Sequence, residues 1–192
     1  MKCDIILAGV GGQGILSIAA TIGLAAVEQG LFLKQSEVHG MSQRGGDVQS
    51  HLRISDSEIH SDLIPHGGAD MIISVEPMEA LRYLPWLAPE GWVITNSVPY
   101  ININDYPDIS GLMAALEDTG NTVVMDADSI ARELGSPRSG NMVILGAASS
   151  FIPMPFEILE HAVRQLFSRK GEEIVDLNIK ALRAGREAAG RQ

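Results

Sequence analysis

A glycine-rich segment near the N-terminus has the composition of an anion-binding turn. Residues 9–14 read Gly-Val-Gly-Gly-Gln-Gly; they follow the apolar run 3–8 and precede a long run of small apolar residues. Glycines allow a tight turn and a close approach of the backbone to a ligand, and the start of a helix presents free N–H groups to a phosphate or carboxylate. We therefore predict that Gly11, Gly12 and Gly14 bind an anion. The alternative is that these glycines only pack the helix against the strand.

A nicotinamide dinucleotide is a second possible ligand for such a turn. Its ribose hydroxyls require an acidic residue about 20 residues beyond the glycines, at the end of the second strand. Glu37 lies near that place, but it follows Lys34-Gln35-Ser36 and is therefore interpreted as a loop residue. A nicotinamide-dependent oxidoreductase stays open as an alternative.

The most unusual segment, residues 36–53, combines glycines with hydrogen-bond donors. It follows the second predicted strand at the carboxyl edge of the sheet, where open α/β folds bind ligands. Arg44 carries a permanent charge suited to bidentate contacts with phosphate or carboxylate, unless it forms a surface ion pair with Glu37 or Asp47. The other candidates are Gln13, Ser42 and Gln43 as hydrogen-bond donors, and Glu37, His39, Gly40, Gly45, Gly46 and Asn96 as loop or interface residues.

Alternating strand and helix patterns must position these residues. The predicted strands are 3–8, 31–34, 71–75, 92–95 and 122–125, with a partly solvated antiparallel hairpin made from 48–54 and 59–63. The predicted helices are 14–29, 77–87, 109–117, 128–135 with Asp128 as its cap, 141–152, 156–169 and 172–189. This pattern predicts one domain over residues 1–192. It is a three-layer α/β Rossmann-like sheet, mostly parallel, with a mainly helical tail over 135–192 that either docks a partner or closes the domain's own core.

Composition narrows the classes of function. The 192 residues carry a net charge of -10, which makes nucleic acid an unlikely partner. Cys3 is the only cysteine, so the chain forms no intramolecular disulfide and a reducing, cytoplasmic location is expected. Glycines interrupt the uncharged run 5–27, so no membrane span is expected. The five histidines are too irregularly spaced to predict a metal site.

Two motifs together resemble the gamma-type domain of 2-oxoacid:ferredoxin oxidoreductases. They are GVGGQG at 9–14 and SEVHGMSQRGGDVQSHLRIS at 36–55, of which the second is more diagnostic. The resemblance covers nearly the whole chain, and the free-standing length is most similar to the indolepyruvate branch of the family. One departure is Asp47, beside the Gly45-Gly46 turn, where the family commonly has a small residue such as Ser.

The resemblance implies a subunit of a complex that oxidatively decarboxylates an aryl 2-oxoacid, passes the acyl group to coenzyme A and reduces ferredoxin. A large partner subunit would carry thiamine diphosphate, magnesium and iron–sulfur clusters. This chain has no Gly-Asp-Gly element and no cluster ligand beyond Cys3, so we expect it to bind none of these cofactors alone and to hold no catalytic residue.

The expected contribution of this chain is one wall of a shared active site and a subunit interface. The glycine turn and the polar loop would meet at the sheet edge and bind a coenzyme A phosphate there. The oxoacid stays open among indolepyruvate, pyruvate, 2-oxoglutarate and branched-chain substrates. A non-catalytic assembly protein, whose loop only docks a partner, is a further alternative.

Overall fold

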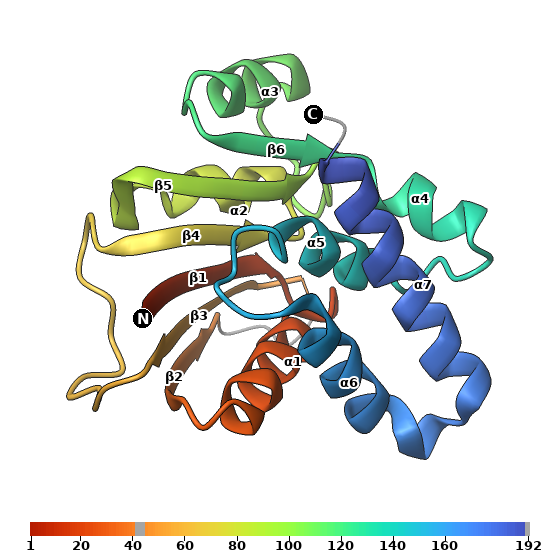
Figure 1. Ribbon diagram of the computed structural model, residues 1–192. Helices are drawn as coiled ribbons and strands as arrows, with labels where there is room; N and C mark the ends of the chain where they lie inside the picture. The colour runs from red at the N-terminus through yellow and green to blue at the C-terminus, as the bar shows by residue number, and fades with distance from the viewer. Residues whose placement is uncertain (41–44, 191–192) are drawn as a thin grey trace.

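The computed structural model describes residues 1–40 and 45–190, and within them six strands form one sheet. The strands are β1 (Lys2–Val10), β2 (Phe32–His39), β3 (Asp47–Ser55), β4 (Ala69–Ser74), β5 (Leu87–Asn96) and β6 (Thr122–Met125). Their order is β2-β3-β1-β4-β5-β6, with β3 antiparallel to both neighbours and the other adjacent pairs parallel (Figure 1). The fold is therefore a mostly parallel α/β sheet with one antiparallel strand inserted.

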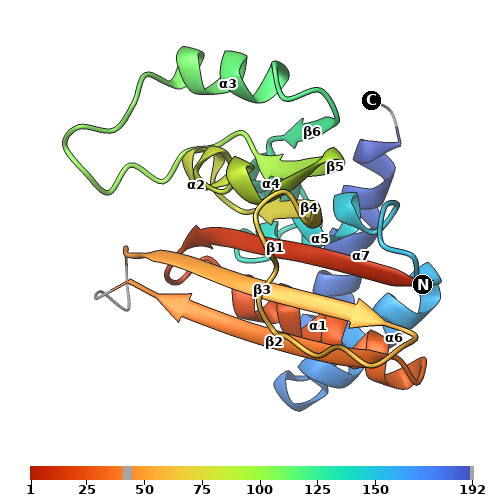
Figure 2. The ribbon, with the colours of Figure 1, turned by 90° about the vertical axis from the view of Figure 1, so that its left-hand side faces the viewer.

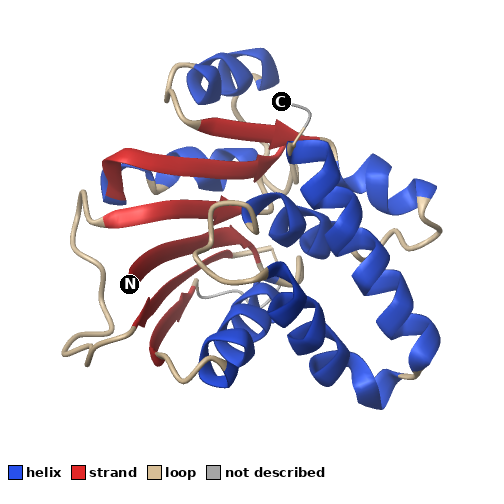
Figure 3. Ribbon diagram, in the orientation of Figure 1, coloured by secondary structure: helices blue, strands red, loops and turns tan. Residues whose placement is uncertain are grey.

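Helices cover both faces of the sheet (Figure 3). The helices are α1 (Ile15–Glu28), α2 (Pro77–Arg82), α3 (Ile109–Glu117), α4 (Ala127–Glu133), α5 (Gly140–Ala148), α6 (Phe156–Phe167) and α7 (Glu172–Ala189), with short 3-10 turns at Leu84–Trp86 and Ser168–Lys170. Side chains of β1 alternate between the layers: Ile5 and Leu7 join the core formed with α1, α5, α6 and α7, and Ile6 joins the core formed with α2 and α3. This explains the apolar run 5–10 in β1, since a strand covered on both faces has no solvent-facing side.

The helical segment after residue 135 closes the domain's own core. Residues 142–149 of α5 and its C-cap are all buried. A Cβ atom on Gly146 would lie 1.9 Å from the carbonyl oxygen of Leu182, and one on Gly185 would lie 1.9 Å from that of Val143. Only glycine at these two positions lets α5 and α7 cross with their backbones in contact.

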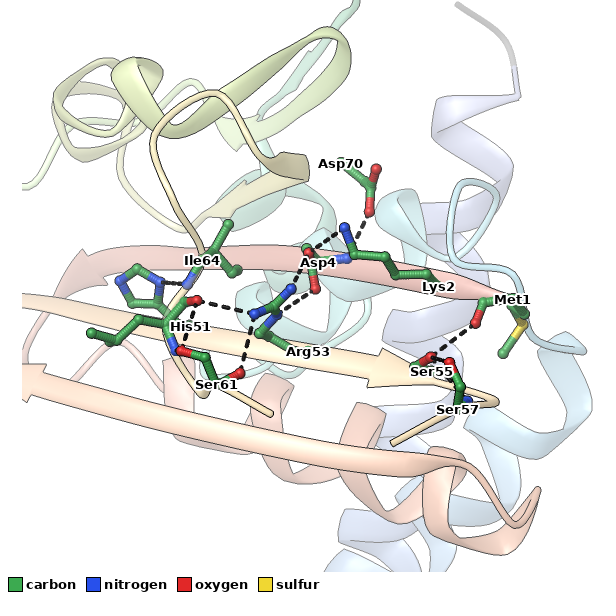
Figure 4. A network of polar contacts seen from close by, with 11 residues as sticks. Met1, Lys2, Asp4, His51, Arg53, Ser55, Ser57, Ser61, Ile64 and Asp70 are labelled. Atoms are coloured by element: carbon green, nitrogen blue, oxygen red, sulfur yellow. Dashed lines mark hydrogen bonds and ion pairs between the residues drawn. The ribbon is translucent and has the colours of Figure 1, made fainter. Parts of the chain in front are cut away.

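The predicted hairpin has a different partner in the structure. β3 pairs with β2, with His39 opposite Val48 and Phe32 opposite Ser55, and residues 59–63 form no strand. The reason is visible in Figure 4: Arg53 on β3 donates from Nη1 to the carbonyl oxygens of Ser61 and Leu63, both at 3.1 Å. These side-chain contacts hold residues 59–63 as a loop over the polar face of the sheet.

The same network buries a carboxylate. Asp4 on β1 is 1% exposed, and the guanidinium of Arg53 binds it in a bidentate manner at 2.8 and 2.9 Å. Lys2 adds a third contact at 2.7 Å. In the same loop, the amide of Ile64 donates to Nδ1 of the buried His51 at 3.0 Å (Figure 4). On this part of the sheet, the face opposite α1 is therefore covered by charged and polar contacts of β1 and β3 with a loop, and not by a helix.

Several predicted boundaries shift. Residues 32–39 form one long edge strand, so Glu37 lies in β2, opposite Ser50, and not in a loop. The helix that starts at Pro77 ends at Arg82, and β5 already begins at Leu87. α5 ends at Ala148 and not at 152. Asp126, and not Asp128, caps α4 by accepting from the amide of Ser129 at 2.7 Å.

Candidate functional site

The glycine turn connects β1 to α1 at the carboxyl edge of the sheet. Gly12 and Gly14 have φ angles of 103° and 83°, in the left-handed region that glycine adopts readily. A Cβ on Gly14 would lie 2.5 Å from Nδ2 of Asn141, whereas no atom of the described residues lies within 4 Å of one on Gly12. Gly14 is therefore required by packing, and Gly12 faces open space.

Hydrogen bonds inside the turn involve the Gln13 side chain. Its Oε1 accepts from the amide of Val10 at 2.8 Å, and its Nε2 lies 3.5 Å from the carbonyl oxygen of Val75, the residue after β4. The Gln13 amide donates back to the carbonyl oxygen of Val10 at 3.1 Å. The side chain that we predicted as a ligand donor thus braces the turn against β4.

The glycine turn and the end of the polar segment are in direct contact. The amide of Gly11 donates to the carbonyl oxygen of Gly46 at 2.8 Å, and the amide of Gly45 donates to that of Gly11 at 3.4 Å. The contact continues the β1–β3 ladder, in which Val10 lies opposite Asp47. Because the Gly11 amide is used internally, it is not available to a ligand in this arrangement. The amides of Gly12 and Gly14 donate no hydrogen bond to any described residue.

A cavity of about 370 Å³ opens beside this turn. It lies between the ends of β1, β4 and β5 and the starts of α4 and α5. Its lining includes Gly12, Gln13, Val75, Asn96, Ala127, Asp128, Pro137, Arg138, Gly140, Asn141 and Ile144. The helix after β1 covers one face of the sheet and the helix after β4 covers the other, so this crevice is the topological switch point, where open α/β sheets bind ligands.

Asn96, the last residue of β5, holds one side of this cavity. Its Oδ1 accepts from the amide of Ala127 at 3.1 Å, and its Nδ2 lies 3.4 Å from the Asp128 carboxylate. Asn96 therefore reaches the same edge as the glycine turn and orients the start of α4. Asp128 supplies a carboxylate to the lining.

A second cavity, of about 480 Å³, shares part of its lining with the first, namely Gly12, Gln13, Pro137, Arg138 and Asn141. It extends from Gly14 along the loop 135–139 to Lys170 and the first half of α7. Neither Arg138 nor Lys170 forms an ion pair with any residue in the described ranges. Their two positive charges make this edge suitable for anions although the whole chain is acidic.

The remaining predicted residues divide into two groups. The amide of Gly40 donates to the carbonyl oxygen of Asp47 at 2.9 Å. The side-chain Nε2 of Gln35 lies 3.5 Å from Oε2 of Glu37. Ser42, Gln43, Arg44 and the side chain of His39 lie outside the described residues. The binding and interface roles of all these residues stay predictions.

Two further features bear on chemistry. Burial raises the pKa of the Cys3 thiol to about 12, so this cysteine is a core residue and not a nucleophile. Among the residues that the structure describes, no three His, Cys, Asp or Glu side chains come together in a way that could hold a metal ion. In the same part of the chain, no helix is both long and apolar enough to cross a bilayer.

Comparison with known proteins identifies the family. The sequence matches the family described as pyruvate ferredoxin/flavodoxin oxidoreductase over residues 4–188. The chain belongs to this family. It is 39% identical to the indolepyruvate oxidoreductase subunit IorB of Archaeoglobus fulgidus, over 96% of this chain and 94% of the relative. It is 37% identical to the IorB subunit of Methanothermobacter thermautotrophicus, over 98% of each.

Two solved structures have the same fold. The gamma subunit of a keto/oxoacid ferredoxin oxidoreductase from Geobacter sulfurreducens aligns with a TM-score of 0.72 at 26% identity, over 99% of both chains. The 2-oxoglutarate:ferredoxin oxidoreductase from Magnetococcus marinus, with 2-oxoglutarate, coenzyme A and succinyl-CoA bound, aligns with a TM-score of 0.78 at 23% identity. This chain covers 31% of the Magnetococcus chain. The protein is an oxidoreductase subunit of the 2-oxoacid:ferredoxin type.

Sequence reasoning missed three residues of the site in this family member. Asp128, Arg138 and Asn141 line the cavity, yet they lie more than a hundred positions beyond the glycine turn. Asn141 donates from Nδ2 to the carbonyl oxygen of Gly14 at 3.0 Å. One signal was present: Asp128 closely follows a predicted strand, and the carboxyl ends of parallel strands share one edge.

Proposed function

We propose that this chain is the small subunit of an oxidoreductase that decarboxylates an aryl 2-oxoacid, with indolepyruvate as the preferred substrate. The support is its similarity to two subunits named indolepyruvate oxidoreductase IorB, over nearly the full length of both relatives. Relatives named for ketoisovalerate and 2-oxoglutarate are 28% and 27% identical. Branched-chain oxoacids, 2-oxoglutarate and pyruvate are therefore the competing substrates.

We further propose that the switch-point cavity binds a phosphate of coenzyme A. The observation that carries this proposal is the position of Gly12, which lines both cavities together with Arg138 and whose amide donates no hydrogen bond to any described residue. Backbone amides and a guanidinium are the donors that phosphate oxygens favour. Arg44, on the segment next to Gly45, is a second candidate for the same phosphate.

In this proposal the chain binds and orients, and the redox chemistry takes place elsewhere. The large partner subunit carries thiamine diphosphate, magnesium and the iron–sulfur clusters, which supply decarboxylation and electron transfer to ferredoxin. The switch-point cavity forms one wall of the shared site, and Arg138 in its lining holds a coenzyme A phosphate. The complex functions in the cytoplasm, where ferredoxin and coenzyme A are present.

The architecture argues against the nicotinamide alternative. Glu37 lies on β2, and β3 separates β2 from β1, the strand that leads into the glycine turn. Two strand spacings amount to roughly 10 Å, so Glu37 is displaced from the position of a ribose-binding acid on the strand adjacent to β1. Titration of the purified chain with NADH, followed by fluorescence, should therefore detect no binding.

The decisive experiment is coexpression with the large subunit, followed by a panel of 2-oxoacids with coenzyme A and ferredoxin or viologen. We expect the highest kcat/KM with indolepyruvate, and no turnover by either subunit alone. Equal activity without this chain would support an assembly role instead. Higher kcat/KM with pyruvate, 2-oxoglutarate or a branched-chain oxoacid would overturn the substrate assignment.

The phosphate assignment has its own test in the assembled enzyme. Arg138→Ala and Arg44→Ala should each raise the KM for coenzyme A roughly 10-fold with little change in kcat, because each removes a charge-assisted hydrogen bond. Arg132→Ala is the matched control, since Arg132 lies in the last turn of α4 and lines neither cavity. An unchanged KM in Arg138→Ala would refute a phosphate beside Gly12.

A further inference from the structure

A fully buried carboxylate follows directly in sequence on a residue of the switch-point cavity. Glu76 follows Val75, which lines the cavity, and its side chain is 0% exposed. A buried carboxylate is tolerated only with good hydrogen-bond donors. Glu76 has three: the amide of Glu79 at 2.8 Å, the amide of Tyr100 at 3.3 Å and the hydroxyl of Tyr106.

Two of these donors come from the segment between β5 and α3. This segment, residues 97–108, extends outward on the side of the molecule where β3 begins (Figure 2). Its side chains Ile101 and Ile103 are 65% and 48% exposed, so apolar burial does little to hold it in place. Tyr100 and Tyr106 attach it to Glu76 at two points on either side of those isoleucines.

Between the two tyrosines, Asn102 connects the segment to Gly45, which contacts the glycine turn. Its Nδ2 donates to the carbonyl oxygen of Gly45. Gly45 in turn donates its amide to Gly11, and Gly46 accepts from the amide of Gly11. A continuous set of hydrogen bonds therefore runs from Glu76, through residues 100–106, to the strand end that borders Gly12.

We infer that Glu76 is a positioning residue: through Tyr106, Tyr100 and Asn102 it holds the Gly45-Gly46 turn against Gly11 and so sets the shape of the cavity beside Gly12. The expected effect on coenzyme A binding rests on the proposed function. The hydrogen-bonded connection from Glu76 to Gly11 does not depend on it. Glu76 touches neither cavity directly and acts through the segment 97–108.

The test uses two tyrosine variants of one segment. Tyr106→Phe removes the hydroxyl that binds Glu76, and Tyr100→Phe keeps the backbone amide that binds Glu76 while removing a hydroxyl with no hydrogen bond to a described residue. Hydrogen exchange of peptides covering residues 9–14 and 45–55 is measured in the full chain within its complex. We expect exchange in residues 9–14 to accelerate roughly 5- to 10-fold in Tyr106→Phe and to stay unchanged in Tyr100→Phe, as the loss of one hydrogen bond implies.

Asn102→Ala should reproduce that effect, because it breaks the next connection toward Gly45. Asn121→Ala, which removes a surface amide bonded to the carbonyl oxygen of Glu90, is its matched control. Unchanged exchange in residues 9–14 in both Tyr106→Phe and Asn102→Ala would overturn the inference.

Kinetics of the assembled enzyme separate the two proposals. If the cavity binds coenzyme A, Tyr106→Phe should raise the KM for coenzyme A several-fold while kcat for the oxoacid stays within two-fold. Faster exchange with an unchanged KM would retain the positioning role of Glu76 and refute the phosphate site. A merely structural role would lower thermal stability without changing either the local exchange or the KM.

Discussion

Asn141 donates a hydrogen bond of 3.0 Å to the carbonyl oxygen of Gly14, and so the start of α5 is attached to the start of α1. Both helices begin at the same edge of the sheet, and the cavity lies between them. This contact explains why Gly14 has no room for a side chain, and it joins the glycine turn to α5.

Gly14→Ala should destabilise the protein by about 2–3 kcal/mol. The left-handed backbone costs about 1–2 kcal/mol for alanine, and the new methyl group would meet Asn141 at 2.5 Å. Gly120→Ala is the control, because Gly120 has a φ of 90° with nothing within 4 Å of a Cβ. Urea denaturation gives both values, and equal losses would show that Asn141 exerts no packing constraint.

Gly146→Ala should be more damaging, with a loss on the order of 3–5 kcal/mol. The added methyl group meets the backbone carbonyl of Leu182 at 1.9 Å, and backbone cannot move aside as a flexible side chain can. Gly190→Ala, at the end of α7, brings no atom closer than 3.6 Å and should stay near the stability of the unsubstituted protein. A Gly146→Ala protein of normal urea midpoint would mean that α5 and α7 cross farther apart.

Removing Arg53 should reveal the cost of an unpaired buried charge. Arg53→Met leaves the carboxylate of Asp4 with Lys2 as its remaining cation, and we expect a loss of about 3 kcal/mol. Arg183→Met breaks a pair with Glu160 at the surface and should change the free energy of unfolding far less. Similar effects of the two substitutions would argue that Asp4 is solvated.

Stability should fall as the pH drops below about 6.5 because of His51. Burial lowers the pKa of His51 in the folded protein, so below its ordinary pKa of 6.5 the unfolded chain binds the proton first. Protonation of Nδ1 would also break the bond from the Ile64 amide. We expect the loss between pH 7.5 and 5 to shrink in His51→Gln and to persist in His60→Gln, whose histidine is exposed. Thermal melts between pH 7.5 and 5 measure this loss of stability. Identical pH profiles for both variants would contradict the assignment of the pH dependence to His51.

Local sequence patterns were sufficient for most of the elements. The apolar run of β1 and the following glycines predicted a strand, a turn and a helix, and each forms within two residues of its expected place. These features depend on neighbours in the chain: burial on both faces of a strand, and the conformational freedom of glycine. The family resemblance rested on two such continuous motifs, and the family match over residues 4–188 confirmed it.

Pairing between segments was harder to predict. Residues 59–63 alternate as a strand does, but Arg53 occupies their carbonyl groups, and β2 takes the place beside β3. The alternation of apolar and polar residues in a strand predicts which side chains share a face, but it does not predict which other strand pairs with it. The edge strand β2 was likewise predicted too short. Its polar residues fit a solvent-exposed edge strand and a loop equally well, so the pattern did not distinguish the two.

The sequence by itself determined the family, the fold class and the glycine turn, because each is written in a continuous stretch of residues. Only the tertiary structure decided that Arg138 and Asn141 border this turn and that Gln13 braces it from within. It also decided that Glu76 connects to Gly45 through residues 100–106. The physical reason is that the sheet brings the ends of separate strands to one edge, and the contacts made there depend on packing and not on distance along the chain.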